Sequence, residues 1–349
     1  MKINAAGLLL CTFLVGCGSG EAPFGNDATD PDTGVEGDDG TITSDRTIPP
    51  GTASPSPDET IFRKEAQDST SGNGFAEGVR YNSADDTFFV DNLPFDGSTD
   101  APYIRGVAVG SLGDYAVYEA VDQYPDSLNG SPINQFRHRA IYGVSQSGQT
   151  EFAIIRTGDY VGYGFGGFVY ERNGTVNLPT TGQALYNGKG AGLRDYVNRG
   201  GLEYSTSDVQ IALDFEDFNA DTGRYEGAVD GFLFNRRVFD LAGNEITNDI
   251  IGRLNEGNNA SLTAIPTAVF TISTNALDNN GEIVGELTSR FSNDAGQPVQ
   301  YEEGQYYGII SGDNADEIVG IIVTESSVDP TAETVRDTTG FTIYRQARE

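Results

Sequence analysis

The chain is poor in the side chains that most often carry chemistry at protein sites. Its 349 residues include no tryptophan, one methionine, one histidine and two cysteines. Both cysteines, Cys11 and Cys17, lie near the N-terminus, so the rest of the chain has no thiol to form a disulfide, bind a metal or act as a nucleophile. One histidine is too few for a zinc site built from several imidazoles. The fold must therefore be stabilised by its core alone.

Basic residues are also scarce. There are 21 lysines and arginines against 52 aspartates and glutamates, which gives a formal net charge of −31. Without a basic patch to neutralise phosphates, nucleic-acid binding is excluded as a function. Strong electrostatic adhesion to anionic lipid is excluded for the same reason. A cationic partner is compatible with this charge, but diffuse acidity more often serves solubility or suits a saline environment.

Residues 1–16 have the pattern of an export signal. Lys2 precedes a short apolar run, Ile3–Val15, which is shorter than the roughly 20 residues that cross a bilayer. The run ends in Leu14-Val15-Gly16-Cys17, which resembles the bacterial lipobox. In that motif the cysteine becomes the new N-terminus and carries fatty acyl chains such as palmitate, so we expect lipidation at Cys17. The alternative is an ordinary secretory signal with an incidental cysteine.

The residue after the cysteine predicts the destination. In the pathway that reads the lipobox, an aspartate at this position favours retention in the inner membrane, whereas this chain has Gly18. We therefore expect a lipid-anchored protein of the outer membrane, on the cell surface, with the periplasmic face as the alternative.

Residues 17–60 form an acidic tether in this interpretation. The segment is rich in Gly, Pro, Ser, Thr and Asp and has almost no large apolar residues, so it buries too little surface to offset the entropy of ordering. An aspartate-rich run, Asp27–Asp39, could suggest a calcium loop. It lacks the ordered aspartate spacing and the following glutamate of such loops, which favours a solvated spacer.

Residues 61–177 predict a β-rich handle domain. Short alternating segments are separated by turn sequences, and long amphipathic helices are absent. A glycine-dense stretch, Gly158–Gly167, lacks the helix that completes a dinucleotide-binding fingerprint, so a closely packed or flexible β edge is favoured over a nucleotide loop or an exposed aromatic contact surface. The expected strands are 75–81, 87–92, 103–109, 115–121, 138–144, 151–156 and 167–171.

Residues 178–349 predict a closed antiparallel barrel. Its first strand follows Leu178 and Pro179 and alternates between Gln183 and Gly188, after which Gly190 and Gly192 suggest close backbone approach. The fold class is therefore all-β, with an eight-stranded barrel beside the handle and an acidic disordered tether. The expected barrel strands are 182–188, 208–215, 225–235, 267–273, 282–291, 305–311, 317–324 and 340–345.

Two connections in the barrel region are informative. The segments 208–215 and 225–235 form the clearest hairpin, and Asp217-x-Asn-x-Asp221 in its turn hints at calcium, although the glycine comes one position too late. The longest connection, 244–259, could contain a short helix near Asp249–Leu254.

Three stretches of the barrel region match one protein family. Thr181-Gly182-Gln-Ala-Leu-Tyr186-Asn-Gly188, the Asp214-Phe215 turn followed by Gly227, and the segment Tyr307–Gly320 resemble the barrel motifs of transferrin-binding-protein-B-like surface lipoproteins. The resemblance covers about residues 180–345 and implies an eight-stranded barrel beside a β handle on the outer membrane. Members bind a host protein such as transferrin, a complement regulator or haemoglobin, and others have no known ligand.

The chain departs from that family in length. The transferrin receptors have two lobes, and this chain has room for a single lobe. Their ligand-gripping loops cannot be matched here, so the resemblance implies no binding residue, and the ligand-binding residues stay unassigned.

Catalysis finds little support in the residues. His138 lies between Arg137 and Arg139, whose charges should disfavour its protonation, and no Gly-x-Ser-x-Gly elbow is present, so we expect a surface or turn histidine. Paired carboxylates leave a glycosidase as a remote alternative. We predict no catalytic residue, no cofactor and no metal. The predicted protein binds an extracellular protein or small ligand and is anchored to the membrane through Cys17; a structural envelope lipoprotein without soluble ligand is the alternative.

Overall fold

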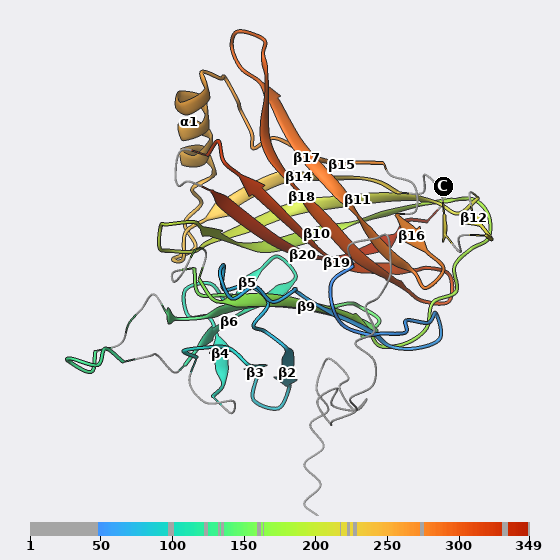
Figure 1. The fold of residues 1–349 in the computed structure, drawn as a ribbon, viewed down its shortest axis with the longest axis horizontal. Helices are drawn as coiled ribbons and strands as arrows, with labels where there is room; N and C mark the ends of the chain where they lie inside the picture. The colour runs from blue at the N-terminus through green and yellow to red at the C-terminus, as the bar shows by residue number, and fades with distance from the viewer. Residues whose placement is uncertain are drawn as a thin grey trace, which may run out of the picture.

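The computed structural model describes the chain from Ile48 to Ala347 with short internal gaps. The residues outside the description are 1–47, 97–100, 122–124, 132, 134–135, 159–161, 163, 217, 222–223, 226–228, 273–275, 330–333 and 348–349. The described residues form two antiparallel sheets and one α-helix (Figure 1), which confirms the all-β class. No helix in the described ranges is both long and apolar enough to span a membrane.

The first sheet has nine strands in the order β1-β9-β8-β7-β6-β4-β3-β2, with β5 paired to β6. All seven segments expected in this region contain a strand, and the short strands β1 and β5 were not predicted. The bounds are β1 Ile61–Lys64, β2 Gly78–Asn82, β3 Thr87–Asp91, β4 Tyr103–Arg105, β5 Ser111–Leu112, β6 Tyr115–Ala120, β7 Arg139–Val144, β8 Thr150–Arg156 and β9 Gly166–Arg172.

The second sheet closes into a barrel of eight antiparallel strands, as predicted. The pairing runs β10-β11-β14-β15-β17-β18-β19-β20 and returns from β20 to β10. Their bounds are β10 Gln183–Tyr196, β11 Glu203–Asp214, β14 Val229–Phe239, β15 Ala268–Phe270, β17 Glu282–Ser292, β18 Pro298–Ser311, β19 Glu317–Ser326 and β20 Val335–Arg345. Three short strands that were not predicted lie outside this cycle: β12 Phe218–Asn219, β13 Arg224–Tyr225 and β16 Leu277–Asp278.

Strand β10 shows why glycine is needed on the inner wall of the barrel. A Cβ at Gly190 would lie 2.7 Å from Ser207 Oγ, and one at Gly192 would lie 2.5 Å from Ser205 Oγ. A Cβ at Gly192 would also lie 2.6 Å from the carbonyl oxygen of Thr338, so the expected close backbone approach is present at this glycine. Side chains from neighbouring strands fill the space, so the barrel has a packed interior.

The barrel interior is apolar at one end. Alternate residues of β11 point inward, so Ile211 and Leu213 join Phe215 in a buried cluster, as their shared face predicted. Phe270 and Tyr306 stack there with ring centroids 4.1 Å apart. The opposite end of the interior is polar and is described below.

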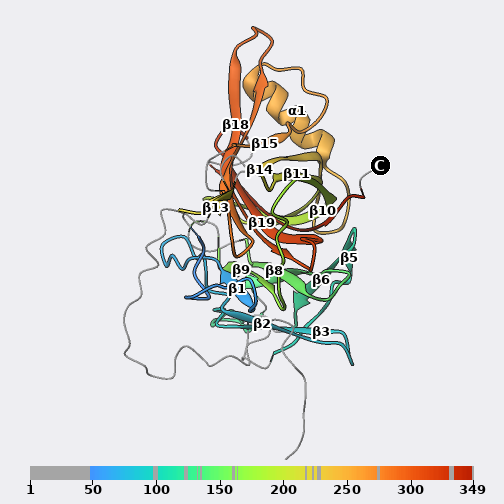
Figure 2. The same ribbon diagram turned by 90° about the vertical axis from the view of Figure 1, so that its right-hand side faces the viewer.

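The nine-stranded sheet packs one face against the outside of the barrel (Figure 2). A buried apolar cluster joins Phe152, Ile154 and Phe168 of the sheet to Leu193 and Ile321 of the barrel. Because both surfaces are removed from water, this contact carries the main attraction between the two parts.

Buried ion pairs cross the same interface. Arg63 of β1 holds Glu282 of β17 with nitrogen–oxygen distances of 2.6 and 2.8 Å. Arg156 of β8 binds Glu65 and lies 3.7 Å from Asp195 of β10. These pairs fix the lateral register of sheet and barrel because each guanidinium must meet a carboxylate at one position.

The other face of the nine-stranded sheet has its own core. The sheet curls, so that β2, β3 and β4 cover the strands β6 to β9, and Phe88, Tyr103, Tyr118 and Tyr142 pack in between. Phe88 stacks on Tyr118 at a centroid distance of 5.4 Å.

The single described helix, α1 (Thr247–Asn258), contains the short helix expected near Asp249–Leu254. It ends at Asn259, whose φ of 50° is left-handed, a conformation that asparagine tolerates at a helix end. Its buried face includes Ile250 and Leu254 and packs with Val238 and Tyr301 at the polar end of the barrel. In Figure 1 the helix lies beside the projecting β17–β18 hairpin.

The interface between sheet and barrel predicts the effect of one added methyl group. Gly340→Ala would place a Cβ 2.1 Å from the buried ring of Phe152, so we expect a loss of about 1–3 kcal/mol in the free energy of unfolding. Gly252→Ala on the exposed face of α1 meets no atom within 4 Å and should gain about 0.5–1 kcal/mol from helix propensity. Urea unfolding of both variants measures the two effects, and an unchanged midpoint for Gly340→Ala would contradict this packing.

Candidate functional site

Several residues singled out in the sequence lie outside the described part. Cys17 and the run Asp27–Asp39 belong to residues 1–47, and Asp217 is also not described. Within the described ranges, no group of three His, Cys, Asp or Glu side chains is placed to hold a metal ion. The glycine-dense stretch leads into β9, where a Cβ at Gly166 would lie 2.1 Å from the carbonyl oxygen of Ile155. Close packing therefore explains that glycine.

His138 is buried, and the expectation of a surface or turn histidine is wrong. Its side chain is fully shielded from solvent just before β7, 6.5 Å from the ring of Tyr103. Burial lowers the pKa of His138 to about 3. The imidazole is therefore neutral as expected, but the cause is desolvation. The flanking Arg137 instead forms an ion pair with Glu119 at 2.8 Å.

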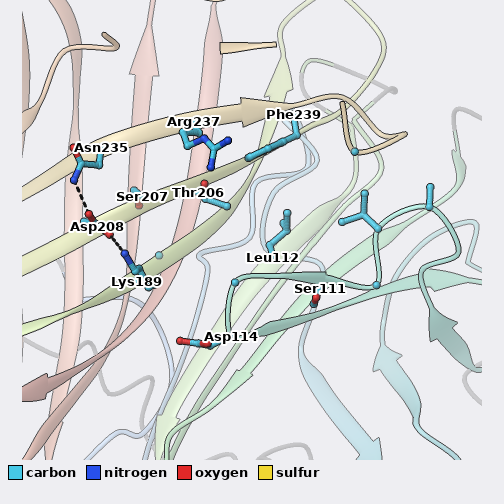
Figure 3. Close-up of a pocket in the computed structure, with 16 residues that line it drawn as sticks. Ser111, Leu112, Asp114, Lys189, Thr206, Ser207, Asp208, Asn235, Arg237 and Phe239 are labelled. Atoms are coloured by element: carbon cyan, nitrogen blue, oxygen red, sulfur yellow. Dashed lines mark hydrogen bonds and ion pairs between the residues drawn. The ribbon is translucent and has the colours of Figure 1, made fainter. Parts of the chain in front are cut away.

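A groove lies between the two parts of the molecule. Its volume is about 710 Å³. One wall is the loop 108–114, which includes β5, and the other is the outer face of β10, β11 and β14 (Figure 3). The loop can approach the barrel because Gly243, in the turn that follows β14, faces Val109: a Cβ there would lie 3.1 Å from the valine side chain.

The barrel wall of the groove carries a chain of polar contacts. Lys189 of β10 forms an ion pair with Asp208 of β11, which accepts a 2.7 Å hydrogen bond from Asn235 of β14. Asn235 has a φ of 50° where the β11–β14 pairing is interrupted by a bulge, which turns its side chain toward Asp208. Burial alone would raise the pKa of Asp208. The hydrogen bonds from Lys189 and Asn235 outweigh this effect and lower the pKa below its ordinary value.

A second charged pair lies farther along the same wall. Arg237 Nε donates to Glu245 at 3.0 Å, and the guanidinium lies 5.2 Å from the ring centre of Phe239. Hydrogen bonds from Arg237 and Thr247 lower the pKa of Glu245 to about 2. The acids on this wall are thus ionised and paired at neutral pH. They can orient a ligand through hydrogen bonds, but they are poor proton donors.

The loop wall adds apolar and hydroxyl groups to the groove. Leu112 and Ser111 lie opposite the barrel strands, with Asp114 at the end of the loop (Figure 3). The groove therefore combines an aliphatic and an aromatic contact with paired charges. Apolar surface combined with a few fixed polar groups is typical of ligand-binding sites.

Sequence reasoning did not find the groove. Its residues come from four segments between positions 108 and 243, and the three barrel residues of the polar chain meet only because the register pairs Lys189 with Asp208. The available signal was weak: polar residues at alternate positions of β10 and β11, which any solvent-facing strand shows.

A carboxylate pair exists, but it is not accessible. Glu151 of β8 lies directly opposite Glu171 of β9, and both side chains are buried in the nine-stranded sheet. Tyr142 donates a 2.5 Å hydrogen bond to Glu151. Because a saccharide would have no access to these oxygens, this pair gives no support to a glycosidase.

Comparison with known proteins gives fold similarity only. No family model and no curated protein sequence matches the chain. A transferrin binding protein B double mutant from Haemophilus parasuis is 12% identical with a TM-score of 0.36, and the match covers 79% of this chain and 46% of that one. Intact Ap-TbpB with its N and C lobes is 12% identical with a TM-score of 0.34, covering 83% and 53%. A structure titled surface lipoprotein is 12% identical with a TM-score of 0.27, covering 59% and 80%.

The chain spans about half the length of the first and second of these proteins. Two of these similar structures are transferrin binding protein B, the protein whose family has the barrel motifs that the sequence resembles. Similarity of this size is not evidence of function, and the strand pairings given above establish the barrel.

Glu151 predicts a pH-dependent stability. Burial raises its pKa to about 7, although the hydrogen bond from Tyr142 acts in the opposite direction. Its favourable contribution is complete below about pH 4.5 and is lost as the pH rises toward 7. Glu151→Gln should therefore match the wild type at pH 4 and exceed its free energy of unfolding by about 1–3 kcal/mol at pH 8.

Denaturant unfolding between pH 4 and pH 8 measures this difference. Glu256→Gln, at an exposed position of α1, is the matched control and should follow the wild-type profile. Equal pH profiles for Glu151→Gln and the wild type would show that the Glu151 carboxyl is solvated.

Proposed function

We propose that this chain is a lipid-anchored protein of the outer membrane that binds a protein or small polar ligand at its surface without catalysis. The observation that carries the binding role is the groove of about 710 Å³ between the loop 108–114 and the barrel. The apolar end of the barrel interior is filled by side chains, so we place the protein or small polar ligand on the outer surface.

The groove has the features of a recognition site. It lies where two separately built surfaces meet, which is a common place for ligand binding. Its paired charges are held in position by β10, β11 and β14, so a ligand would not have to order them on binding. An anchor at Cys17, followed by the acidic tether, would hold the folded part at a membrane surface.

The direction of the chain supports a groove that faces away from the anchor. Pro49 and Pro50, near the start of the described chain, line a second hollow with Phe168 and Tyr307. This hollow lies at the β1–β9 side of the interface, whereas the groove lies at the β5–β6 side. The described chain therefore starts at the edge opposite the groove.

The anchor is tested by cysteine substitution in a Gram-negative host. Cys17→Ser should move the protein from the membrane fraction to the soluble fraction, because the acylated residue is lost. Cys11→Ser is the matched control and should stay in the membrane fraction. Continued membrane association of Cys17→Ser would contradict lipidation at this residue.

The groove is tested with a pair of Thr→Trp variants. Thr206→Trp places an indole in the groove, and Thr271→Trp places one on an exposed part of the barrel. The labelled mature protein is applied to arrays of extracellular proteins and glycans. Every ligand bound by the wild type should bind at least tenfold more weakly to Thr206→Trp and unchanged to Thr271→Trp, since 1.4 kcal/mol of lost contact is a factor of ten.

A ligand that binds all three proteins equally would place the binding site elsewhere. Absence of any ligand would favour the alternative, a structural envelope lipoprotein. Circular dichroism of both variants shows that the tryptophans leave the fold intact.

A further inference from the structure

The polar end of the barrel interior contains a cluster of buried charges, which we call the polar chamber. Its members come from five barrel strands and the β19–β20 connection and are all less than 9% exposed. Helix α1 and its apolar neighbours lie at this end of the barrel. The chamber consists of Arg194, Glu203, Arg236, Glu302, Asp329 and Asp337.

Each arginine of the chamber lies near two carboxylates. Arg236 holds Glu302 with distances of 2.5 and 2.9 Å and lies 3.6 Å from Asp337. Arg194 lies 3.2 Å from Asp329 and 3.7 Å from Glu203. Every guanidinium is therefore shared, and one carboxylate of each pair is held at a longer distance.

The chamber has more negative than positive charge. Two guanidinium groups face four carboxylates, so the described residues carry a formal charge of −2. Two tyrosines that reach into the chamber, Tyr196 and Tyr301, are uncharged because burial raises the pKa of each phenol. Burying an excess of charge is costly, and although Asp337 also accepts hydrogen bonds from Ser205 and Thr339, a further positive group would lower that cost.

Unpartnered hydroxyl groups lie beside these carboxylates. Ser289 is directly opposite Glu302 across β17 and β18, and Thr324 is directly opposite Asp337 across β19 and β20. Both side chains are 1% exposed, and neither oxygen has a hydrogen-bond partner in the described structure. Cross-strand neighbours have Cβ atoms about 5 Å apart, which leaves room for one bridging species between hydroxyl and carboxylate.

We propose that the polar chamber binds a monovalent alkali cation. The cation supplies the missing positive charge, and the oxygens of Ser289, Thr324 and the chamber carboxylates are the hard ligands that such an ion prefers. A divalent ion fits less well, because the chamber contains two guanidinium groups and the described residues offer no group of three acids, histidines or cysteines placed to hold a metal. The bound cation stabilises the end of the barrel on which α1 packs.

The test is thermal unfolding of the mature full chain at pH 7 and constant ionic strength. Choline chloride is replaced stepwise by sodium chloride or potassium chloride. Choline screens the acidic surface equally well but is too large for the chamber. We expect the melting temperature to rise by about 2–5 °C in one of the two alkali salts and to saturate, as for a single site.

A pair of double variants locates the effect. Ser289→Ala with Thr324→Val removes the two chamber hydroxyls and should abolish the difference between alkali and choline salts. Ser292→Ala with Thr271→Val changes exposed positions and should retain it. Equal melting temperatures of the wild type in all three salts would overturn the proposal, as would a shift that survives in the chamber variant.

A second measurement does not require the chamber variant to fold. The ²³Na resonance should broaden in the presence of the wild-type protein, and potassium but not choline should reverse the excess broadening at constant ionic strength. Broadening that choline reverses equally, or no broadening together with equal melting temperatures in all three salts, would show only diffuse surface screening and would overturn the proposal.

Discussion

The pairing of β10 with β20 is the constraint on which the rest of the structure depends. Tyr186 to Tyr196 on one strand pair with Val335 to Arg345 on the other, which joins the two ends of the sheet. Without this closure both strands would present unpaired edges. Closure also fixes the direction in which each side chain of β10 points. Lys189 faces the groove, Leu193 faces the nine-stranded sheet and Arg194 faces the polar chamber.

Buried charge recurs at the contacts that must be exact in position. The interface between sheet and barrel contains the Arg63–Glu282 and Arg156–Asp195 pairs, and all four side chains are almost fully buried. Such pairs add little net stability because desolvation offsets their attraction, but a shifted register would leave each charge alone. The chain has only 21 lysines and arginines, so the buried arginines are a notable share of its positive charge. The apolar cluster supplies the attraction, and the ion pairs select one arrangement.

The groove and the chamber illustrate two outcomes of the same chemistry. In the groove, Lys189 and Arg237 neutralise acids at the surface, so the wall is polar and balanced and suits recognition. In the chamber, two arginines share four carboxylates away from water, and an added positive charge would lower the cost of burying them. The difference lies in solvent, because a surface imbalance is screened and a buried one is not.

The sequence alone determined the elements whose pattern is local. Period-two alternation located all eight barrel strands, and the β11–β14 hairpin followed from Ile211, Leu213 and a glycine-containing turn. The lipobox at Cys17 is also a local signal, and it stays a prediction because that residue lies outside the described chain. The two-residue strands β5, β12, β13 and β16 were missed because two residues are too few to show a period.

Only the tertiary structure decided which side chains lose water. His138 has charged neighbours in sequence, yet the fold buries it against Tyr103, and Glu151 acquires its raised pKa from a sheet that covers it. Lys189, Asp208 and Asn235 meet through strand register and a bulge, and Ser289 meets Glu302 through a pairing within the closed barrel. Alternation along a strand specifies which residues share a face, but burial and charge balance depend on what the closed barrel and the docked sheet place opposite that face.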